Sequence, residues 1–217
     1  MSIGRLEQIT NYKATDWMHI IVDPLGGALS WKASPISNFF GNIPTPIVLA
    51  GSGKIEKCEW IPASAARAPG VKPATYSDHG ISGAWSFADG AEEYIHANIK
   101  IPTDMDLSVD SKICLGWSSA ATSLNCDWEI AYLITAPDED TAAAAEATEQ
   151  SYEESSAVSN GMIITEFCVI PGGTIGDTDI CLHIQVMRDG NDGSDTLNAA
   201  AEVHGLSLCY TSDKLGK

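Results

Sequence analysis

The segment 188–196, RDGNDGSDT, contains the group of carboxylates that comes nearest to a metal-binding pattern in this sequence. It brings Asp189, Asp192 and Asp195 close together, and their oxygens could be presented to Ca²⁺. The long EF-hand loop with its terminal Glu is absent. Asp, Asn and Gly also supply turn conformations, so a polar connection between two strands is favoured. A calcium site stays open as the alternative.

Other residues of catalytic type lack the spacing that catalysis or cofactor binding needs. PGGTIG at 171–176 has no Gly-Lys-Ser/Thr ending, and Ser82, close to His79, lacks the strand-to-helix elbow of a hydrolase nucleophile. The histidines never fall at His-x-His or His-x-x-x-His spacing; they are His19, His79, His96, His183 and His204. The sequence therefore predicts no catalytic residue, no cofactor and no metal site, and we expect a protein that is not an enzyme.

Three tryptophans could form a platform on which sugars stack. They are Trp85, Trp117 and Trp128, and the last has Asp127 and Glu129 beside it. In a β-sandwich an aromatic side chain with a polar tip is more often part of the core or of an interface. A host-surface glycan-binding module that uses these indoles is thus an alternative to a purely structural role.

The six cysteines are scattered and form no Cys-x-x-Cys pair. Residues 1–10 contain no apolar run of signal-peptide type, so we expect a protein made in a cytoplasm, where disulfides are rare. Free Cys packs as a small hydrophobe. We therefore predict six buried free thiols, at Cys58, Cys114, Cys126, Cys168, Cys181 and Cys209.

The chain is strongly acidic. Its 217 residues include 29 Asp and Glu against 12 Lys and Arg, which gives a formal net charge of −17. That charge opposes sequence-independent attraction to nucleic acid or to anionic lipid. We expect neither nucleic acid nor a membrane as a partner.

Short β-strands follow one another through the C-terminal two thirds of the chain, and apolar and polar residues alternate along several of them. In 93–101 every second residue from Ile95 is apolar, and 179–187 alternates in the same way. In the last strand a bulge at Gly205 would restore the register between Val203 and Leu206. The predicted strands are 83–87, 93–101, 112–118, 127–135, 161–170, 179–187 and 201–211, with Tyr76 marking a possible eighth. The sequence predicts an all-β fold, an antiparallel jelly-roll-like β-sandwich over 75–217.

Residues 1–74 differ from the rest of the chain in composition and in the pattern of apolar residues. A hairpin is expected around the Pro-Leu-Gly-Gly turn at 24–27, followed by a short helical turn at 34–42. The segment 42–73 holds five prolines and a strand-like stretch at 55–61, so 1–74 is predicted to be a hairpin and an extended attachment arm. Within the sandwich, the Ala- and Glu-rich insertion at 137–160 is expected to be a surface loop with one or two helical turns.

The C-terminal sequence resembles the end of a family of tailed-phage and prophage virion proteins that contain a β-sandwich. In that family a strand ends in Arg-Asp, a loop carries Asp-Thr, and the last strand ends near Tyr-Thr before a Lys-Gly tail. The corresponding positions are Arg188, Asp189, Asp195, Thr196, Tyr210, Thr211, Lys214 and Gly216. FADGAEEYIHANIKIPTDMD and the strand 127–135 are similar too, so the resemblance covers roughly Trp85 to the C-terminus.

The N-terminal part resembles a separate segment of phage structural proteins. There a Val-Asp-Asp-Pro-like turn precedes a Lys-containing strand and an Asn-Leu-Phe-Gly-like helical end. The matching residues are Ile21, Val22, Asp23, Pro24, Gly26, Lys32, Asn38, Phe39, Phe40 and Gly41. The sequence departs from this pattern at Ala33 and Pro35, where a β-branched residue and a non-proline are more usual.

The resemblance implies a non-catalytic virion component, such as a capsid decoration, head-fibre, neck or tail subunit, and often a homotrimer. Its partners would be further copies of itself and other virion proteins. An arm too small to bury its own apolar residues gains burial only against another chain. The predicted attachment residues are Trp17, Ile21, Asp23, Pro24, Trp31, Phe39 and Phe40.

Overall fold

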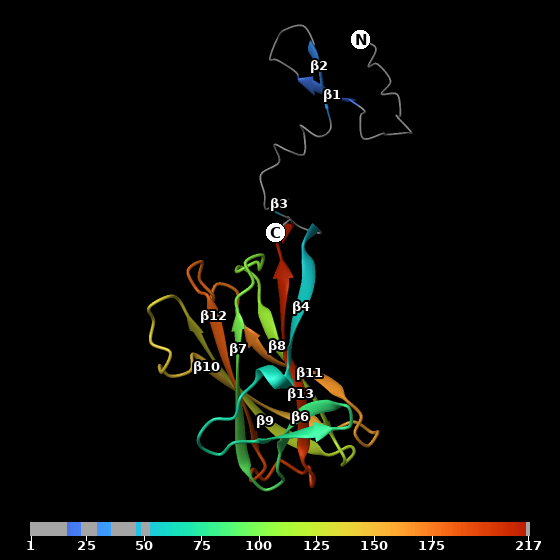
Figure 1. Ribbon diagram of the computed structural model, residues 1–217, viewed down its shortest axis with the longest axis vertical. Coiled ribbons are helices and arrows are strands. Elements are labelled where there is room, and N and C mark those ends of the chain that lie inside the picture. Colours follow the sequence, from blue (N-terminus) through green and yellow to red (C-terminus); the bar gives the residue numbers. More distant parts are fainter. Residues whose placement is uncertain (1–16, 23–29, 36–46, 49–52, 216–217) are drawn as a thin grey trace. The chain divides into compact units, whose positions relative to one another are not determined.

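The computed structural model describes the backbone of residues 17–22, 30–35, 47–48 and 53–215, and the side chains of residues 53–213 (Figure 1). The chain divides into two units. One comprises Met1–Ile47 with Leu215–Lys217, and the other comprises Val48–Lys214.

The first unit contains an antiparallel hairpin. Strand β1 (Trp17–Val22) pairs with β2 (Ser30–Pro35), with Trp17 opposite Pro35 and Val22 opposite Ser30. The hairpin predicted around the turn at 24–27 is therefore confirmed. Of the helical turn predicted for 34–42, residues 34 and 35 belong to β2 and the remainder lies outside the described residues.

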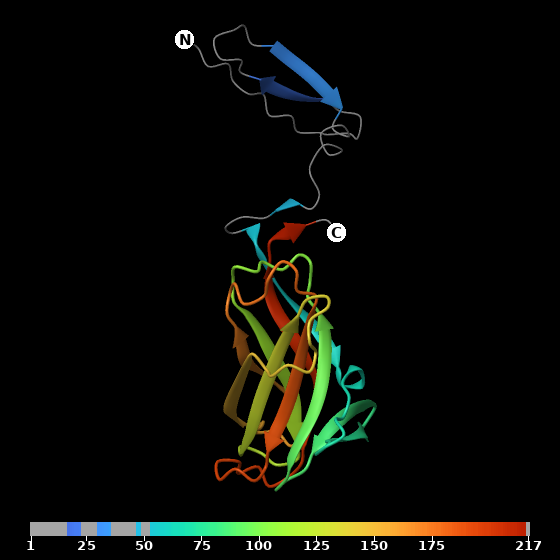
Figure 2. The same cartoon turned by 90° about the vertical axis from the view of Figure 1, so that its left-hand side faces the viewer.

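The second unit is a β-sandwich of two antiparallel sheets (Figures 1 and 2). The four-stranded sheet has the order β10-β9-β12-β7, and the six-stranded sheet has the order β11-β8-β13-β6-β5, with β4 also paired to β13. The strands are β4 (Ile55–Pro62), β5 (Thr75–His79), β6 (Ser82–Phe87), β7 (Glu92–Lys100), β8 (Ser111–Ser119), β9 (Asn125–Thr135), β10 (Ala147–Glu154), β11 (Ile163–Ile170), β12 (Cys181–Asp189) and β13 (Ala201–Ser212). A 3₁₀ turn, η2 (Ala63–Ala65), and the two-residue strands β3 (Ile47–Val48) and β14 (Lys214–Leu215) complete the elements.

The order of strands β6 to β13 is that of a jelly roll. These eight strands divide into β6-β13-β8-β11 in one sheet and β7-β12-β9-β10 in the other. All successive strands except β9 and β10 lie in opposite sheets, so the chain wraps back and forth across the core. The predicted all-β, jelly-roll-like fold is confirmed.

Side chains that alternate along the strands fill the space between the sheets. Ile95 and Ala97 on β7, and Leu182, Ile184 and Val186 on β12, are buried, as their period-2 spacing predicted. Strand β12 pairs with β7 on one side and with β9 on the other. The polar residues that alternate with these buried ones on β7 and β12 therefore lie together on the outer face of the four-stranded sheet.

A bulge lies at the place predicted in the last strand. The pairing of β13 with β8 shifts register between Val203 and Gly205. A Cβ at Gly205 would lie 2.5 Å from the Ile61 carbonyl oxygen and equally close to the Trp60 ring. This position therefore has no room for a side chain.

Gly205→Ala is expected to lower the free energy of unfolding by about 1–3 kcal/mol, the usual cost of overpacking. The neighbouring carbonyl belongs to backbone and cannot turn aside. Gly193→Ala is the matched control, because nothing lies within 4 Å of a Cβ there. Urea unfolding of both variants checks this, and equal stabilities would contradict it.

Two expectations about 42–74 and 137–160 need correction. The expected boundary of the sandwich lies at 74/75, but β4 pairs with β13 along Ile55–Pro62 and belongs to the six-stranded sheet. The insertion contains β10, paired with β9, instead of helical turns. Helix propensity is a weak preference, and pairing to a neighbouring strand overrides it here.

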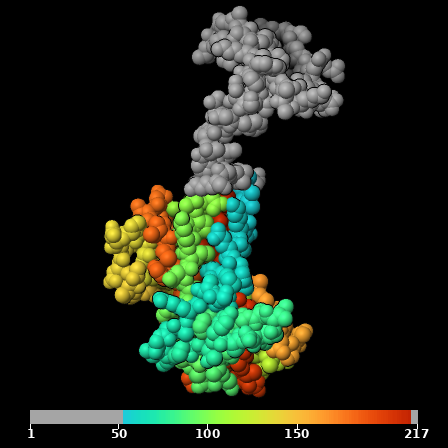
Figure 3. Space-filling view, viewed as in Figure 1, coloured from blue at the N-terminus to red at the C-terminus, as the bar shows by residue number. Residues whose placement is uncertain are grey.

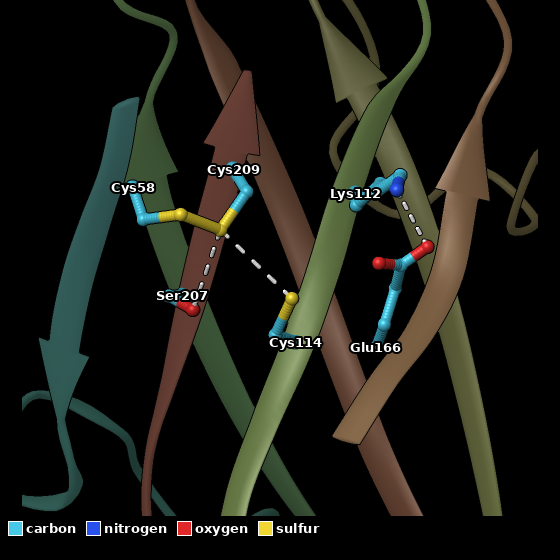
Figure 4. Close-up of a disulfide and its surroundings, with 6 residues drawn as sticks. All are labelled: Cys58, Lys112, Cys114, Glu166, Ser207 and Cys209. Carbon is cyan, nitrogen blue, oxygen red and sulfur yellow. Dashed lines mark hydrogen bonds and ion pairs between the residues drawn. A yellow bond between two sulfur atoms is a disulfide. The ribbon is translucent and has the colours of Figure 1, made fainter. Parts of the chain in front are cut away.

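The prediction that all six cysteines are free is wrong for one pair. Cys58 on β4 and Cys209 on β13 stand directly opposite in the ladder and form a disulfide (Figure 4). The Cys114 sulfur lies 3.9 Å from that of Cys209. The other thiols are free, as predicted: Cys114, Cys126 and Cys168 are buried, and Cys181 is half-buried.

Candidate functional site

The three tryptophans proposed as a glycan platform lie in the core. Trp85 is 8% exposed, and Trp117 and Trp128 are completely buried. Trp117 from one sheet meets Trp128 from the other edge to face, with ring centroids 5.6 Å apart, and Phe87 packs on Trp128 at 5.2 Å. These indoles pack between the two sheets, as the favoured interpretation had it, and the alternative of a sugar-stacking platform at these positions is wrong.

The three aspartates of 189–195 accept hydrogen bonds from groups of the protein itself. Both oxygens of Asp195 accept hydrogen bonds from the Arg188 guanidinium, at 2.9 Å each. Asp189 and Asp192 accept from backbone N–H groups within the loop. Among the described residues, no group of three or more His, Cys, Asp or Glu is arranged to hold a metal ion. The loop has the geometry of the polar connection that the sequence favoured.

Arg188, near the end of β12, holds this loop in place through its guanidinium. Its side chain is fully buried, and besides Asp195 it donates to the backbone carbonyls of Phe87, Ala199 and Leu197. Burial opposes the charge, but the hydrogen bonds and charge of Asp195 outweigh it and raise the pKa of Arg188. The arginine thereby ties the end of β12 to β6 and to the segment that enters β13.

Asp127, beside this loop, is 1% exposed, and its Oδ1 has no hydrogen-bond partner among the described residues. Burial raises the pKa of the Asp127 carboxyl to about 6. The hydrogen bond from Gln150 to Oδ2 opposes that rise, whereas the charges of the three loop aspartates add to it. The folded protein therefore binds this proton more tightly than the unfolded chain does.

Asp127→Asn is expected to raise the free energy of unfolding by about 1–3 kcal/mol at pH 8, with the gain disappearing toward pH 4. Because the folded pKa lies above the unfolded value, the carboxyl's contribution to stability is fully present at low pH and is lost as the pH rises through about 6. Urea unfolding at pH 4, 6 and 8 measures this. The exposed Asp78→Asn is the control, and a gain from Asp127→Asn that does not vary with pH would contradict the account.

The Ser82 hydroxyl and the His79 ring have separate partners. Ser82 Oγ donates to the backbone carbonyl of His79, and the His79 ring instead packs against His204. The predicted attachment residues Trp17 and Ile21 lie on β1 and Trp31 lies on β2. Asp23, Pro24, Phe39 and Phe40 lie outside the described residues.

The surface feature that most resembles a ligand-binding site is an open groove on the outer face of the four-stranded sheet, which we call the outer groove. One part is a hollow of about 240 Å³ lined by Arg67, His96, Asn98, Ala131, Tyr132, Leu133, Thr141, Ala143, Ala145, His183, Ile184 and Gln185. An adjoining hollow of about 360 Å³ shares His96 and Gln185 and is lined further by Pro69, Val71, Lys72 and Tyr94.

The segment after β4 forms one side of this groove. Arg67 and His96 exchange two backbone hydrogen bonds of 2.8 Å, and Tyr94 bonds through its backbone to Lys72 and Ala74. Figure 3 shows this segment in cyan and turquoise, spread over the surface of the sandwich. Residues 67–74 are thereby held along β7.

Hydrogen bonds fix the polar side chains in the groove. His183 lies between Asn98 and Thr135, with Nδ1 3.0 Å from Asn98 Oδ1 and Nε2 3.0 Å from Thr135 Oγ1. Gln185 Nε2 lies 2.9 Å from His96 Nε2. Burial, and next the Arg67 charge, lower the pKa of His96 and favour its neutral form. Within the described part of the chain the Asn98 amide N–H₂ and the Gln185 side-chain carbonyl have no hydrogen-bond partner, so they are free to bind a ligand.

A second surface is apolar and lies on the outer face of the six-stranded sheet. Trp60 is 44% exposed, Met162 51% and Ile164 63%. The Trp60 ring lies over Gly116 and Gly205, where a Cβ would come within 2.6 Å of it. We call Trp60, Met162 and Ile164 the apolar patch.

Sequence reasoning missed both surfaces. Alternation put His96 with Asn98, and His183 with Gln185, on polar strand faces, but only the pairing of β7 with β12 brings the four together. Trp60 and Arg67 fall within the predicted arm. The signal that could have found Trp60 is its place in the strand-like 55–61, two residues after Cys58 and so on the same strand face.

No protein-family model matches the sequence, and no curated protein matches it either. Among solved structures, an arabinose-bound GH51 α-L-arabinofuranosidase aligns with 70% of this chain at 13% identity and a TM-score of 0.39, and the chain spans 23% of that protein. An infectious bursal disease virus Gt strain structure aligns with 88% of the chain at 12% identity and a TM-score of 0.38, over 40% of its own length. A family 11 carbohydrate-binding module from Clostridium thermocellum aligns with 73% of the chain at 15% identity and a TM-score of 0.31, over 84% of its length. Similarities this weak carry no functional argument, and the jelly-roll assignment rests on strand order.

In the part of the chain that the structure describes, no helix has the length and apolarity needed to cross a bilayer.

Proposed function

We propose that this chain is a non-catalytic structural subunit of a tailed-phage particle, in which the N-terminal unit attaches the subunit and the jelly roll faces outward. The observation that carries the proposal is the division of the chain at 47/48. The second unit contains a continuous buried core of its own. An isolated two-stranded hairpin such as β1–β2 is marginally stable in water, so it gains stability by binding a partner.

The apolar patch supports protein contacts in an assembly. Large exposed apolar side chains that cluster on a sheet face mark interaction surfaces. The proposed partners are further copies of the chain, in a homotrimer, and other virion proteins. The net charge of −17 argues against nucleic acid and anionic membranes as partners.

A fragment of residues 48–217 is expected to remain folded but not to join particles, because it keeps the jelly roll, β4 and the disulfide but lacks the hairpin. Incorporation is measured by adding tagged full-length chain or fragment during particle assembly and assaying purified particles. The fragment's thermal unfolding and single disulfide confirm its fold. Incorporation of the folded fragment at the level of the full chain would contradict the proposal.

A further inference from the structure

We propose that the outer groove binds an acidic sugar chain, meaning sugar units that carry a carboxylate or a sulfate. This inference goes beyond the structural role and does not depend on particle assembly. The ligand class follows from the charge, the hydrogen-bonding groups and the form of the groove.

The charged residues that line the outer groove are cationic, whereas the chain as a whole is acidic. Of the described residues that line either hollow, none is Asp or Glu, although the chain contains 29 of these residues. Arg67, Lys72 and two histidines lie there instead. An anionic group entering the first hollow would therefore meet cationic or neutral side chains. In the adjoining hollow the Lys72 charge is paired with Glu92, which also accepts a hydrogen bond from the Tyr94 hydroxyl, so Arg67 is the cation that selects the anion.

Arg67 is available for that anion. Within residues 53–213, five cations form ion pairs, namely Lys54, Lys57, Lys72, Lys112 and Arg188. Arg67 and Lys100 form none in this described range. Lys100 follows Asn98 on the same face of β7, so both cations without an ion pair lie at or beside the groove. A guanidinium binds carboxylate and sulfate-like groups through paired, charge-assisted hydrogen bonds.

The remaining groups suit sugar hydroxyls. The Asn98 amide donates, the Gln185 carbonyl accepts, and the Thr141 hydroxyl can do both. In the adjoining hollow, Tyr94 provides an aromatic ring beside the apolar Val71 and Pro69. Because the two hollows share His96 and Gln185, a chain of several sugar units can occupy both. Their combined size falls in the range of about 300–1,000 Å³ that is usual for ligand sites.

Calorimetric titration of the full chain tests this with four probes: a trigalacturonate, a sulfated trisaccharide, neutral galactotriose and inorganic sulfate. At least one acidic trisaccharide is expected to bind at least tenfold more tightly than galactotriose and inorganic sulfate. Arg67→Ala is expected to weaken that binding at least tenfold. Asn98→Asp is expected to weaken it likewise, because it adds a carboxylate to the groove.

Lys112→Ala is the matched control, since it removes one cation from a strand of the opposite sheet and is expected to leave affinity unchanged. Thermal unfolding shows that each variant is folded. The proposal would be overturned by no binding of either acidic trisaccharide, by equal binding of galactotriose, or by inorganic sulfate binding as tightly as the trisaccharide. Binding that survives Arg67→Ala but is lost in Trp60→Ala would place the sugar on the apolar patch and would also overturn it.

Discussion

Arg188→Ala is expected to lower the free energy of unfolding by about 3–5 kcal/mol, a larger loss than removal of the disulfide should cause. The change leaves the Asp195 carboxylate buried without its cation and removes the donors to three backbone carbonyls. Breaking a buried pair from one side is costly because the remaining charge is uncompensated. Residues 190–200, which connect β12 with β13, should loosen first.

Arg67→Ala is the matched control, because it removes the other described arginine from an exposed position where it forms no ion pair within residues 53–213. A change within about 0.5 kcal/mol is expected there. Urea unfolding gives both values, and hydrogen exchange in the 190–200 loop locates the damage. A loss below about 1 kcal/mol for Arg188→Ala would show that this network does not hold the sandwich together.

Removing the disulfide is expected to have the second largest effect. Cys58 and Cys209 are 151 residues apart, and the loop-entropy relation gives about 5 kcal/mol for a crosslink of that span. Measured values usually fall below this relation, so Cys58→Ser should cost about 2–4 kcal/mol. Strand β4, which pairs only with β13 among the described strands, should then separate more readily from the sheet.

Cys181→Ser is the control, because this thiol is free and half-buried. Thiol titration of the denatured, unreduced chain should return four free thiols, and six after reduction. Six free thiols without reduction would show that the pair is not oxidised in the isolated protein. An unchanged unfolding free energy for Cys58→Ser would contradict the stabilising role.

The sequence predicted the strands whose two faces differ in polarity. Along β7 and β12, isoleucine, leucine, valine and alanine alternate with polar side chains, so both strands and their buried faces followed from period 2. The bulge at Gly205 followed from the phase change between Val203 and Leu206. These features are local, and a single strand is enough to show them.

Features that depend on pairing between strands far apart in the chain could not be predicted from the sequence. Strand β10 reads Ala-Thr-Glu-Gln-Ser-Tyr-Glu-Glu, which has too little apolar contrast to reveal a strand and contains good helix formers. Strand β4 lies in a proline-rich segment, and its partner β13 is about 150 residues away. The disulfide depends on that pairing, as the outer groove depends on the pairing of β7 with β12.

The core position of the three tryptophans was the interpretation that the sequence favoured over a glycan platform. Trp117 and Trp128 meet across the two sheets, and no spacing within one strand reveals such a contact. In the sequence, Arg188 stands out only as part of a resembling motif. Its role follows from the closure of its loop around the guanidinium, which brings Asp195 and three carbonyls within hydrogen-bond distance.

The protein content of purified particles tests the proposed structural role most directly. Tailed-phage particles from a host that carries the gene for this chain would be purified by density gradient, washed in high salt and quantified by mass spectrometry. The chain is expected at a constant copy number per particle, a multiple of three, that resists the wash. Intact, infectious particles without the chain, or a copy number that varies and falls away on washing, would contradict the proposal.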